Sequence, residues 1–159
     1  MPGKVAPGKV APIEAIIEVD ASPAEVWKIV ADQRRMNEWS PELFKQKFFG
    51  GSIGVGTRSI NLNKRNGFVW PTASKITEFV PEKKIVFHVY GPAALWSYEL
   101  EQTQTGTKVT ERRVLKGGKR TVASRITAAI GLGGIEGHDV ELIEGMIKTL
   151  AHIKAEAEG

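Results

Sequence analysis

The stretch Val19-Asp20-Ala21-Ser22-Pro23-Ala24-Glu25-Val26-Trp27 marks the change from a strand to a helix. Before it, apolar and polar residues alternate over residues 13–20, which predicts a half-buried strand. Ser22 has the chemistry of an N-cap, and Pro23 suits the first helical position. Glu25 lies three residues after Ser22 and completes a capping box. The pattern therefore predicts a strand that leads directly into a capped helix.

Strand-like runs dominate the middle of the chain. We predict two short helices after the first strand, over about residues 23–32 and 34–39. Six further strands follow, over about residues 43–49, 57–63, 68–79, 84–90, 94–103 and 108–115. Turn-forming residues separate these runs, and Asn66-Gly67 is the sharpest separator because both residues tolerate the positive φ of a tight hairpin. The links are too short for crossover helices, so we expect an antiparallel meander.

The apolar period changes after Gly117-Gly118. A short helix is predicted over about residues 122–130, ended by the glycine-rich residues 131–134. The longest helix is predicted over about residues 136–156, where apolar residues recur at helical spacing, namely Val140, Ile143, Ile147, Leu150 and Ile153. This helix is the natural cover for the concave side of the sheet.

The composition fits one globular domain. The chain has 159 residues, of which 42% are hydrophobic and 25% charged. We expect a flexible N-terminal tail over residues 1–11 and a single domain over 12–158. The absence of cysteine excludes thiol chemistry, and it is compatible with the cytoplasm, where we expect the protein. No apolar stretch approaches the roughly 20 residues that cross a bilayer, so we expect no membrane insertion.

The basic residues and the histidines indicate no charged ligand or metal. The net charge is +4, but the basic residues are scattered along the chain, so we interpret them as solvated strand faces and turns rather than a specific nucleic-acid site. His88, His138 and His152 show no metal-ligand spacing. The glycine-rich residues 50–56 and 131–134 match no phosphate-binding loop. We expect no metal and no cofactor.

Several short motifs together resemble a known superfamily. They are residues 21–27 (ASPAEVW), 37–41 (NEWSP), 54–58 (GVGTR), 106–110 (GTKVT) and 149–154 (TLAHIK). With this order of elements, the chain resembles the START-like, or SRPBCC, superfamily of polyketide cyclase/dehydrase and birch-pollen-allergen-like proteins. The resemblance implies an α+β helix-grip fold, in which a curved antiparallel sheet of about seven strands wraps around the C-terminal helix. It also implies a deep cavity between sheet and helix for a lipid, polyketide or other hydrophobic molecule.

Side-chain parity indicates which residues line this hollow. Residues two apart on a strand share a face, which groups several aromatic side chains with a few polar ones. Such a mixture is typical of a site for a mainly apolar ligand, while the alternative is a filled core packed with the same rings. The residues predicted to bind the ligand are Trp39, Phe48, Arg58, Ile60, Trp70, Ser74, Phe87, Trp96, Tyr98, Glu111, Arg113, Ile143 and Ile147.

Charged residues on two strands share the parity of apolar neighbours. Glu111 and Arg113 alternate with the same face as Val109, and Arg58 shares a face with Ile60. If these faces point inward, the charged groups bind a polar part of the ligand or polarise a carbonyl. The alternative is a register shift or bulge that places them on the surface.

Three functions remain open at this point. The first is a binder of a hydrophobic small molecule, driven by burial of the ligand's apolar area. The second is a cyclase or aromatase in which Tyr98, Glu111 or Arg113 handles protons. The third is a protein-interaction or toxin-like member of the superfamily. The chain is expected to be a monomer or a homodimer, with pairing through an edge strand as one route to a dimer.

Overall fold

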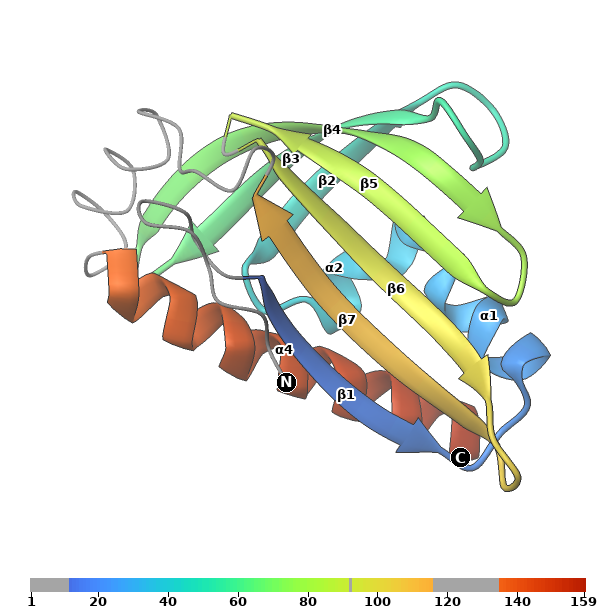
Figure 1. Ribbon diagram of the computed structural model, residues 1–159. Coiled ribbons are helices and arrows are strands. Elements are labelled where there is room, and N and C mark those ends of the chain that lie inside the picture. The colour runs from blue at the N-terminus through green and yellow to red at the C-terminus, as the bar shows by residue number, and fades with distance from the viewer. Residues whose placement is uncertain (1–11, 92, 116–134) are drawn as a thin grey trace.

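A seven-stranded antiparallel sheet and a long C-terminal helix make up most of the described structure (Figure 1). The computed structural model describes residues 12–91, 93–115 and 135–159. The strands lie in the order β1-β7-β6-β5-β4-β3-β2. They are β1 (Ile13–Val19), β2 (Leu43–Phe49), β3 (Arg58–Arg65), β4 (Phe68–Val80), β5 (Lys84–Tyr90), β6 (Ala94–Gln102) and β7 (Thr107–Leu115). The helical elements are α1 (Pro23–Val30), the 3-10 turn η1 (Gln33–Arg35), α2 (Met36–Trp39) and α4 (Ile135–Glu158).

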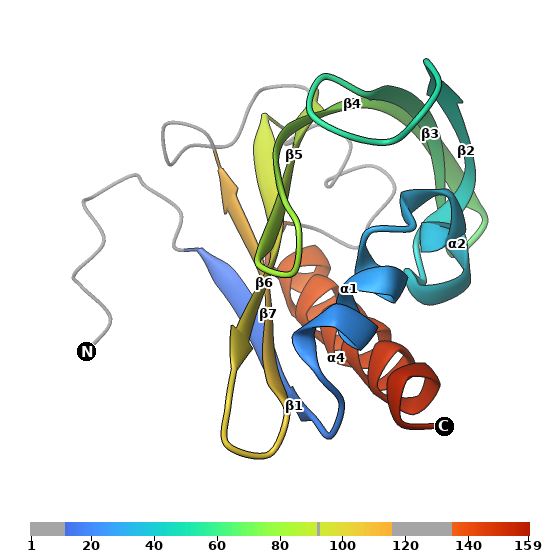
Figure 2. The ribbon, with the colours of Figure 1, turned by 90° about the vertical axis from the view of Figure 1, so that its right-hand side faces the viewer.

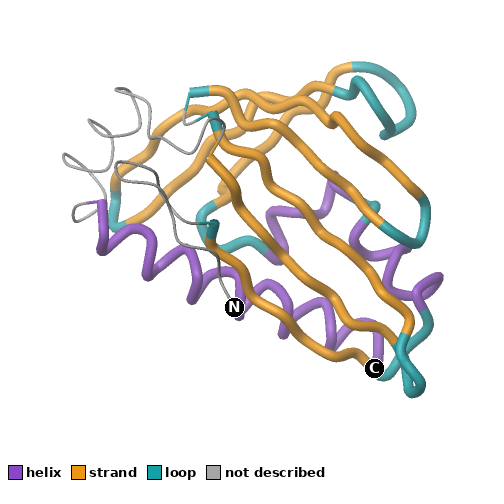
Figure 3. The backbone as a smooth tube through the Cα atoms, in the orientation of Figure 1, coloured by secondary structure: helices purple, strands orange, loops and turns teal. Residues whose placement is uncertain are grey.

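The sheet curves around the helices, which confirms the predicted helix-grip fold. Figure 2 shows the sheet as an arc, with α4 and the shorter helices on its concave side. The backbone trace in Figure 3 shows the same separation of strands from helices. The predicted tail over residues 1–11, the short helix over 122–130 and the glycine-rich residues 131–134 lie outside the described residues. No helix in the described part of the chain is long and apolar enough to cross a membrane.

The start of α1 is capped as the sequence predicts. The backbone N–H of Glu25 donates to Ser22 Oγ, and the backbone N–H of Ser22 donates to Glu25 Oε2, both at 3.2 Å. These two bonds satisfy donors that the first turn of a helix otherwise leaves without partners. Pro23 occupies the first turn, where its missing N–H costs nothing. The cap therefore fixes where α1 leaves the end of β1.

The hairpin between β3 and β4 is set by Asn66 and Gly67. Their φ angles are 50° and 80°, as a two-residue turn between strands requires. This turn places Arg65 opposite Phe68, and the register continues with Asn63 opposite Trp70 and Ser59 opposite Ser74. Because residues opposite each other in an antiparallel pair share a face, the turn decides which side of β3 points inward.

The hydrophobic core lies where α1, the sheet and the C-terminal half of α4 meet. Its most deeply buried side chains include Val26, Val30, Ile85, Val109, Leu150 and Ile153. The β6–β7 turn closes tightly over the end of β1, because a Cβ added at Gly106 would collide with the carbonyl oxygen of Val19. Thr107 is fully buried beside this turn and donates from Oγ1 to the carbonyl oxygen of Ala21 at 2.8 Å. These contacts hold the sheet to the start of α1.

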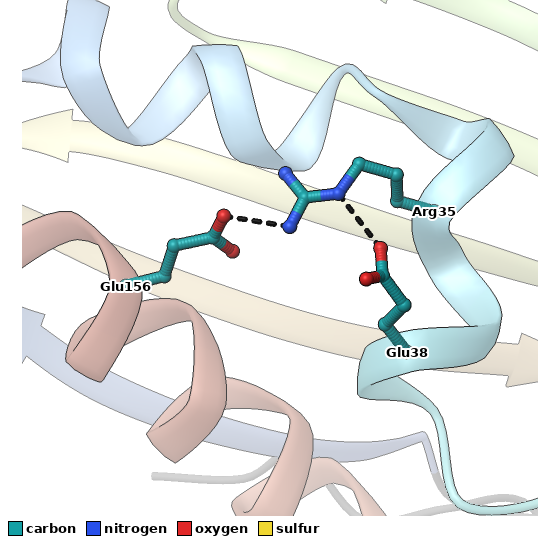
Figure 4. Close-up of polar contacts among 3 residues, drawn as sticks. All are labelled: Arg35, Glu38 and Glu156. Carbon is teal, nitrogen blue, oxygen red and sulfur yellow. Dashed lines mark hydrogen bonds and ion pairs between the residues drawn. The ribbon is translucent and has the colours of Figure 1, made fainter.

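Polar contacts fix the C-terminal half of α4 against the rest of the molecule. Arg35 joins two helices: its Nε lies 2.7 Å from Glu38 Oε2 and its Nη2 lies 2.6 Å from Glu156 Oε1 (Figure 4). Inside the core, Thr149 donates from Oγ1 to the carbonyl oxygen of Trp39 at 3.0 Å. Near the C-terminus, Lys154 Nζ donates to the carbonyl oxygen of Glu18 at 2.9 Å.

Candidate functional site

A cavity of about 410 Å³ lies between the concave face of the sheet and the N-terminal half of α4. Strands β2 to β7 all contribute side chains to its wall. The loop before β2 and helix α4 close its other side with residues that include Pro41, Leu142, Gly145, Met146 and Thr149. The volume lies within the range of about 300–1,000 Å³ that is usual for small-molecule sites. The rings of the chain therefore do not fill the space between the sheet and the helix.

One wall of the cavity is polar. It is built from β2, β3 and β4, and its side chains are Gln46, Ser59, Asn61, Asn63, Thr72 and Ser74. These residues come to lie together because the Asn66-Gly67 turn sets opposite residues of β3 and β4 on the same face. We call this set the polar wall.

The polar wall is held together by side-chain hydrogen bonds. Ser59 Oγ and Ser74 Oγ lie 2.6 Å apart, and Ser59 Oγ also donates to Asn61 Oδ1 at 2.9 Å. Gln46 Nε2 donates to the same Asn61 oxygen at 3.0 Å, while Asn63 Nδ2 donates to Thr72 Oγ1 at 3.0 Å. These bonds fix the positions of the side chains before any ligand arrives. Gln46 Oε1 is buried and has no hydrogen-bond partner within the described residues, so it is available to a ligand donor.

The opposite wall is mainly apolar and aromatic. Phe87 and Val89 of β5 and Trp96 of β6 line it, and Met146 of α4 closes it. Trp70 of β4 also lines the cavity and stacks on Phe68, with ring centroids 5.6 Å apart. A flat apolar molecule in the cavity would therefore contact rings on one side and the polar wall on the other.

Tyr98 and Glu111 form a buried pair in the cavity wall. Tyr98 Oη donates to Glu111 Oε1 at 3.0 Å, and the two residues are 2% and 4% exposed. Burial raises the pKa of Glu111 from 4.5 to about 8, although the hydrogen bond from Tyr98 lowers it in part. Burial first, and then the charge of Glu111, also raises the pKa of Tyr98 well above 10. At neutral pH both groups therefore carry their protons.

The protonated carboxyl group presents a hydrogen-bonding atom to the cavity. Glu111 Oε2 is buried and has no hydrogen-bond partner within the described part of the chain. A neutral carboxyl group can both donate and accept a hydrogen bond. Arg113 follows two residues later on the same face of β7, is 4% exposed and lines the same cavity. This end of the cavity therefore offers an acid, a phenol and a guanidinium group to a ligand.

Ionic contacts join three elements at the rim of the cavity. Arg65, at the end of β3, forms an ion pair with Glu141 of α4, and its Nη1 lies 3.7 Å from Glu42 Oε1 in the loop before β2. The Arg65 side chain is only 9% exposed, whereas that of Glu141 is 47% exposed. Because Glu141 remains in contact with water, we expect this ion pair to contribute about 1 kcal/mol or less.

Eight of the thirteen predicted ligand-binding residues line the cavity. They are Phe48, Trp70, Ser74, Phe87, Trp96, Tyr98, Glu111 and Arg113. The inward orientation of Glu111 and Arg113 follows the parity of β7, where Val109 is fully buried. Their binding of a ligand stays a prediction.

The other five predicted residues lie outside the cavity, so those predictions are wrong. Trp39 is buried in the core beside the cavity, where its backbone accepts the hydrogen bond from Thr149. Arg58 and Ile60 point outward, because the register of β3 turns the opposite face inward. Ile143 and Ile147 lie on α4 but do not line the cavity, and Ile147 is 56% exposed.

The sequence reasoning missed two groups of residues. The first is Ser59, Asn61 and Asn63, which face the cavity in place of Arg58 and Ile60. The signal was present, because the predicted two-residue turn at Asn66-Gly67 already implied that they share a face with the inward side of β4. The second group is the inner side of α4, where the cavity is lined by Leu142, Gly145, Met146 and Thr149. Among the described residues, no three His, Asp or Glu side chains come together as metal ligands do.

Solved structures share this fold at low sequence identity. The di-domain ARO/CYC protein StfQ from the steffimycin biosynthetic pathway matches with a TM-score of 0.74 and 14% identity, over 95% of this chain and 51% of that chain. The chain thus spans about half the length of StfQ. TTHA0849 from Thermus thermophilus matches with a TM-score of 0.70 and 16% identity, over 94% of this chain and 100% of that chain. The Aha1 dimer from Colwellia psychrerythraea matches with a TM-score of 0.62 and 15% identity, over 94% and 97% of the two chains.

Sequence comparison places the chain in a family. A search of curated proteins finds no match. The family model described as polyketide cyclase/dehydrase and lipid transport matches residues 11–157, which include every described strand and nearly all of α4. The chain therefore belongs to the polyketide cyclase/dehydrase and lipid transport family.

Proposed function

We propose that the protein binds a small, mainly apolar molecule that carries hydrogen-bonding groups along one edge. The observation that carries this proposal is the division of the cavity into a polar wall on β2 to β4 and an aromatic wall on β5 and β6. Burial of apolar ligand area at about 25 cal/mol per Å² supplies the driving force. The polar wall then selects among ligands of similar size, since a buried polar group without a partner costs about 1–3 kcal/mol.

Two positions make the polar wall selective rather than merely wet. Asn61 is at its centre, where Oδ1 accepts from both Gln46 and Ser59. Gln46 Oε1 and Glu111 Oε2 are buried acceptors without a partner among the described residues. A ligand with hydroxyl groups can satisfy them, whereas a pure hydrocarbon leaves them unpaired. We therefore propose a hydroxylated or keto-substituted ring compound over a saturated fatty chain.

Native mass spectrometry of protein purified without denaturation tests whether a small molecule copurifies. A matched pair of probes tests the polar edge: 1,8-dihydroxyanthraquinone against anthracene, titrated by calorimetry. We expect the hydroxylated probe to bind at least tenfold more tightly, and Asn61→Leu to remove that preference while anthracene binding persists. Ile60→Leu, on the outer face of the same strand, is the control. Equal affinity for both probes would contradict the proposal.

A second function is favoured by the Tyr98–Glu111 pair. A buried acid that holds its proton at neutral pH beside a phenol is suited to proton transfer, and such groups are common in active sites. We propose as the alternative a cyclase- or aromatase-type reaction in which Glu111 gives a proton to, or takes one from, a bound polyketide. Arg113 would stabilise the negative charge that develops on a carbonyl oxygen.

The two functions separate in one experiment. For an identified substrate, Glu111→Gln keeps the shape of the side chain but cannot transfer a proton. If the protein is a cyclase, Glu111→Gln loses turnover by roughly 100-fold or more with little change in binding. If turnover persists in Glu111→Gln and Arg113→Met, the catalytic roles are wrong and binding alone remains.

A further inference from the structure

The charge of the chain is divided unevenly along the sequence. Residues 43–77 contain no Asp or Glu but contain six basic residues, which are Lys45, Lys47, Arg58, Lys64, Arg65 and Lys75. The rest of the chain has 16 basic and 18 acidic residues, a net charge of −2. The excess positive charge of the whole protein therefore comes from this one segment. Charge asymmetry of this kind points to a negatively charged partner.

The fold places much of this charge on one exposed face. Residues 43–77 form β2, β3 and most of β4, and their outward side chains lie in rows across the sheet. One row runs Lys47, Ile60, Ala73 and Tyr90, and the next runs Phe49, Arg58, Lys75 and His88. We call the outward side chains of these strands the basic outer face; it comprises Lys45, Lys47, Arg58, Lys75, Phe49, Ile60, Val69 and Tyr90.

The cations of the basic outer face have no acidic partners. Within the described residues, none of Lys45, Lys47, Arg58 and Lys75 forms an ion pair, and Lys45 and Lys47 instead lie 5.4 and 5.6 Å from neighbouring phenyl rings. On the other half of the sheet the outward cations are paired with carboxylates. These pairs are Lys84 with Glu78 and Glu99, Lys108 with Glu101, and Arg112 with Glu14. The positive charge of the basic outer face is thus left available.

Large apolar side chains lie exposed between these cations. Phe49, Ile60, Val69 and Tyr90 are each between 46% and 50% exposed. Exposed apolar residues are ordinary when they occur singly, but a group of them on one face marks a surface that meets a partner. The register places Ile60 beside Lys47 and Phe49 beside Arg58, so apolar and cationic groups alternate across the face.

We propose that the basic outer face binds the surface of an anionic membrane. The Lys and Arg side chains would contact lipid headgroups, and the apolar side chains would reach the boundary between headgroups and acyl chains. The face binds at the membrane surface and requires no spanning helix. This proposal concerns a surface outside the cavity and holds whether or not the cavity ligand is the one proposed above.

A dimer interface, a nucleic-acid site and protection of the sheet edge each account for less of this pattern. A symmetric dimer through this face would bring like charges together. Nucleic acid offers the right charge, but aliphatic side chains such as Ile60 and Val69 provide no stacking surface for bases. Lysines protect the edges of sheets from unwanted pairing, which would explain Lys45 and Lys47 on the edge strand β2. Edge protection does not explain Arg58 and Lys75, which lie on inner strands.

The test is cosedimentation with vesicles of phosphatidylcholine alone or with 30% phosphatidylglycerol, in 0.1 M NaCl. We expect binding only to the anionic vesicles. The triple variant Lys47→Gln/Arg58→Gln/Lys75→Gln should bind about 100-fold more weakly, since each basic residue near an anionic surface is worth about tenfold at most. The control is Lys28→Gln/Lys83→Gln/Lys108→Gln, which removes the same charge from other surfaces and should bind as the wild type does.

A second variant separates a membrane from any polyanion. Phe49→Ser/Ile60→Ser leaves the charge unchanged and should weaken vesicle binding about tenfold, because it removes the apolar contact. Circular dichroism checks that each variant folds. The proposal is overturned if the wild type ignores anionic vesicles, if the control weakens as much as the triple variant, or if Phe49→Ser/Ile60→Ser binds unchanged. Tighter binding to a 20-nucleotide oligothymidylate than to anionic vesicles would overturn it too.

Discussion

Replacing Glu111 with glutamine should change how the stability of the protein depends on pH. In the folded protein, burial raises the pKa of Glu111 to about 8, whereas in the unfolded chain the carboxyl group has an ordinary pKa near 4.5. Between these two values the folded state holds a proton that the unfolded state has lost. The free energy of unfolding therefore falls as the pH rises through this range, and the loss is complete above the folded pKa.

The size of the effect follows from the two pKa values. One pKa unit corresponds to about 1.4 kcal/mol, so the wild type should lose roughly 5 kcal/mol of stability from this group between pH 4 and pH 9. Glutamine has nearly the same shape, can accept the hydrogen bond from Tyr98 and does not titrate. The stability of Glu111→Gln relative to the wild type should therefore increase steadily with pH. All other titrating groups are common to both proteins and cancel in the difference.

Urea unfolding at pH 5, 6.5, 8 and 9 measures this difference directly. Glu101→Gln is the matched control, because Glu101 has a 76% exposed side chain and its replacement should give a constant difference. Tyr98→Phe removes the hydrogen bond that lowers the pKa of Glu111, so in that variant the decline should extend to higher pH. A difference between Glu111→Gln and wild type that stays within about 1 kcal/mol from pH 5 to pH 9 would refute the reasoning.

Three further predictions concern packing and the direction of side chains. Gly106→Ala should reduce the free energy of unfolding by more than about 2 kcal/mol because its Cβ has no room, while Gly51→Ala, with open space around it, should stay within about 0.5 kcal/mol; equal effects would disprove the tight turn. Thr107→Val should cost about 1–3 kcal/mol, because it leaves a buried carbonyl oxygen unpaired, and an unchanged urea midpoint would argue against that hydrogen bond. Trp70→Ala should weaken binding of 1,8-dihydroxyanthraquinone at least tenfold by calorimetry. Ile60→Ala should not change it, and the reverse order would mean that the face of β3 is misassigned.

The order of elements could be predicted because it depends on local chemistry. The Ser22 capping box, the Asn66-Gly67 turn and the alternation along each strand are short-range signals that work without knowledge of the rest of the fold. All three are present in the structure. The inward faces of β4 to β7 could also be predicted, because in these strands one face carries most of the apolar side chains.

The inward face of β3 could not be read from its own alternation. That strand has Ile60 and Leu62 on one face and Ser59 and Asn61 on the other, so the usual rule favours burying the first pair. The rule assumes an apolar interior, but here β3 lines a cavity with a polar wall. Combining the turn with the pairing to β4 would have resolved the choice, since Asn61 lies opposite Thr72.

The inward side of α4 was ambiguous for a different reason. Apolar residues occupy more than half of its circumference, so several faces have similar hydrophobic character. The structure buries Met146, Thr149, Leu150 and Ile153 and leaves Val140 and Ile147 more than half exposed. Which face is buried depends on how the sheet curves, and this depends on contacts between residues distant in the sequence.

The uneven fastening of α4 has a consequence for what the cavity can accept. Its last turns are secured to the core and to Arg35, whereas the turns over the cavity touch the strands mainly through Arg65 and a few small or flexible side chains. The helix is thus a lever with its pivot at the C-terminal end, and tilting it disturbs little of the buried interior. Guests of different bulk can be admitted by this movement, so discrimination among them rests with the strands and not with a tight fit beneath the helix.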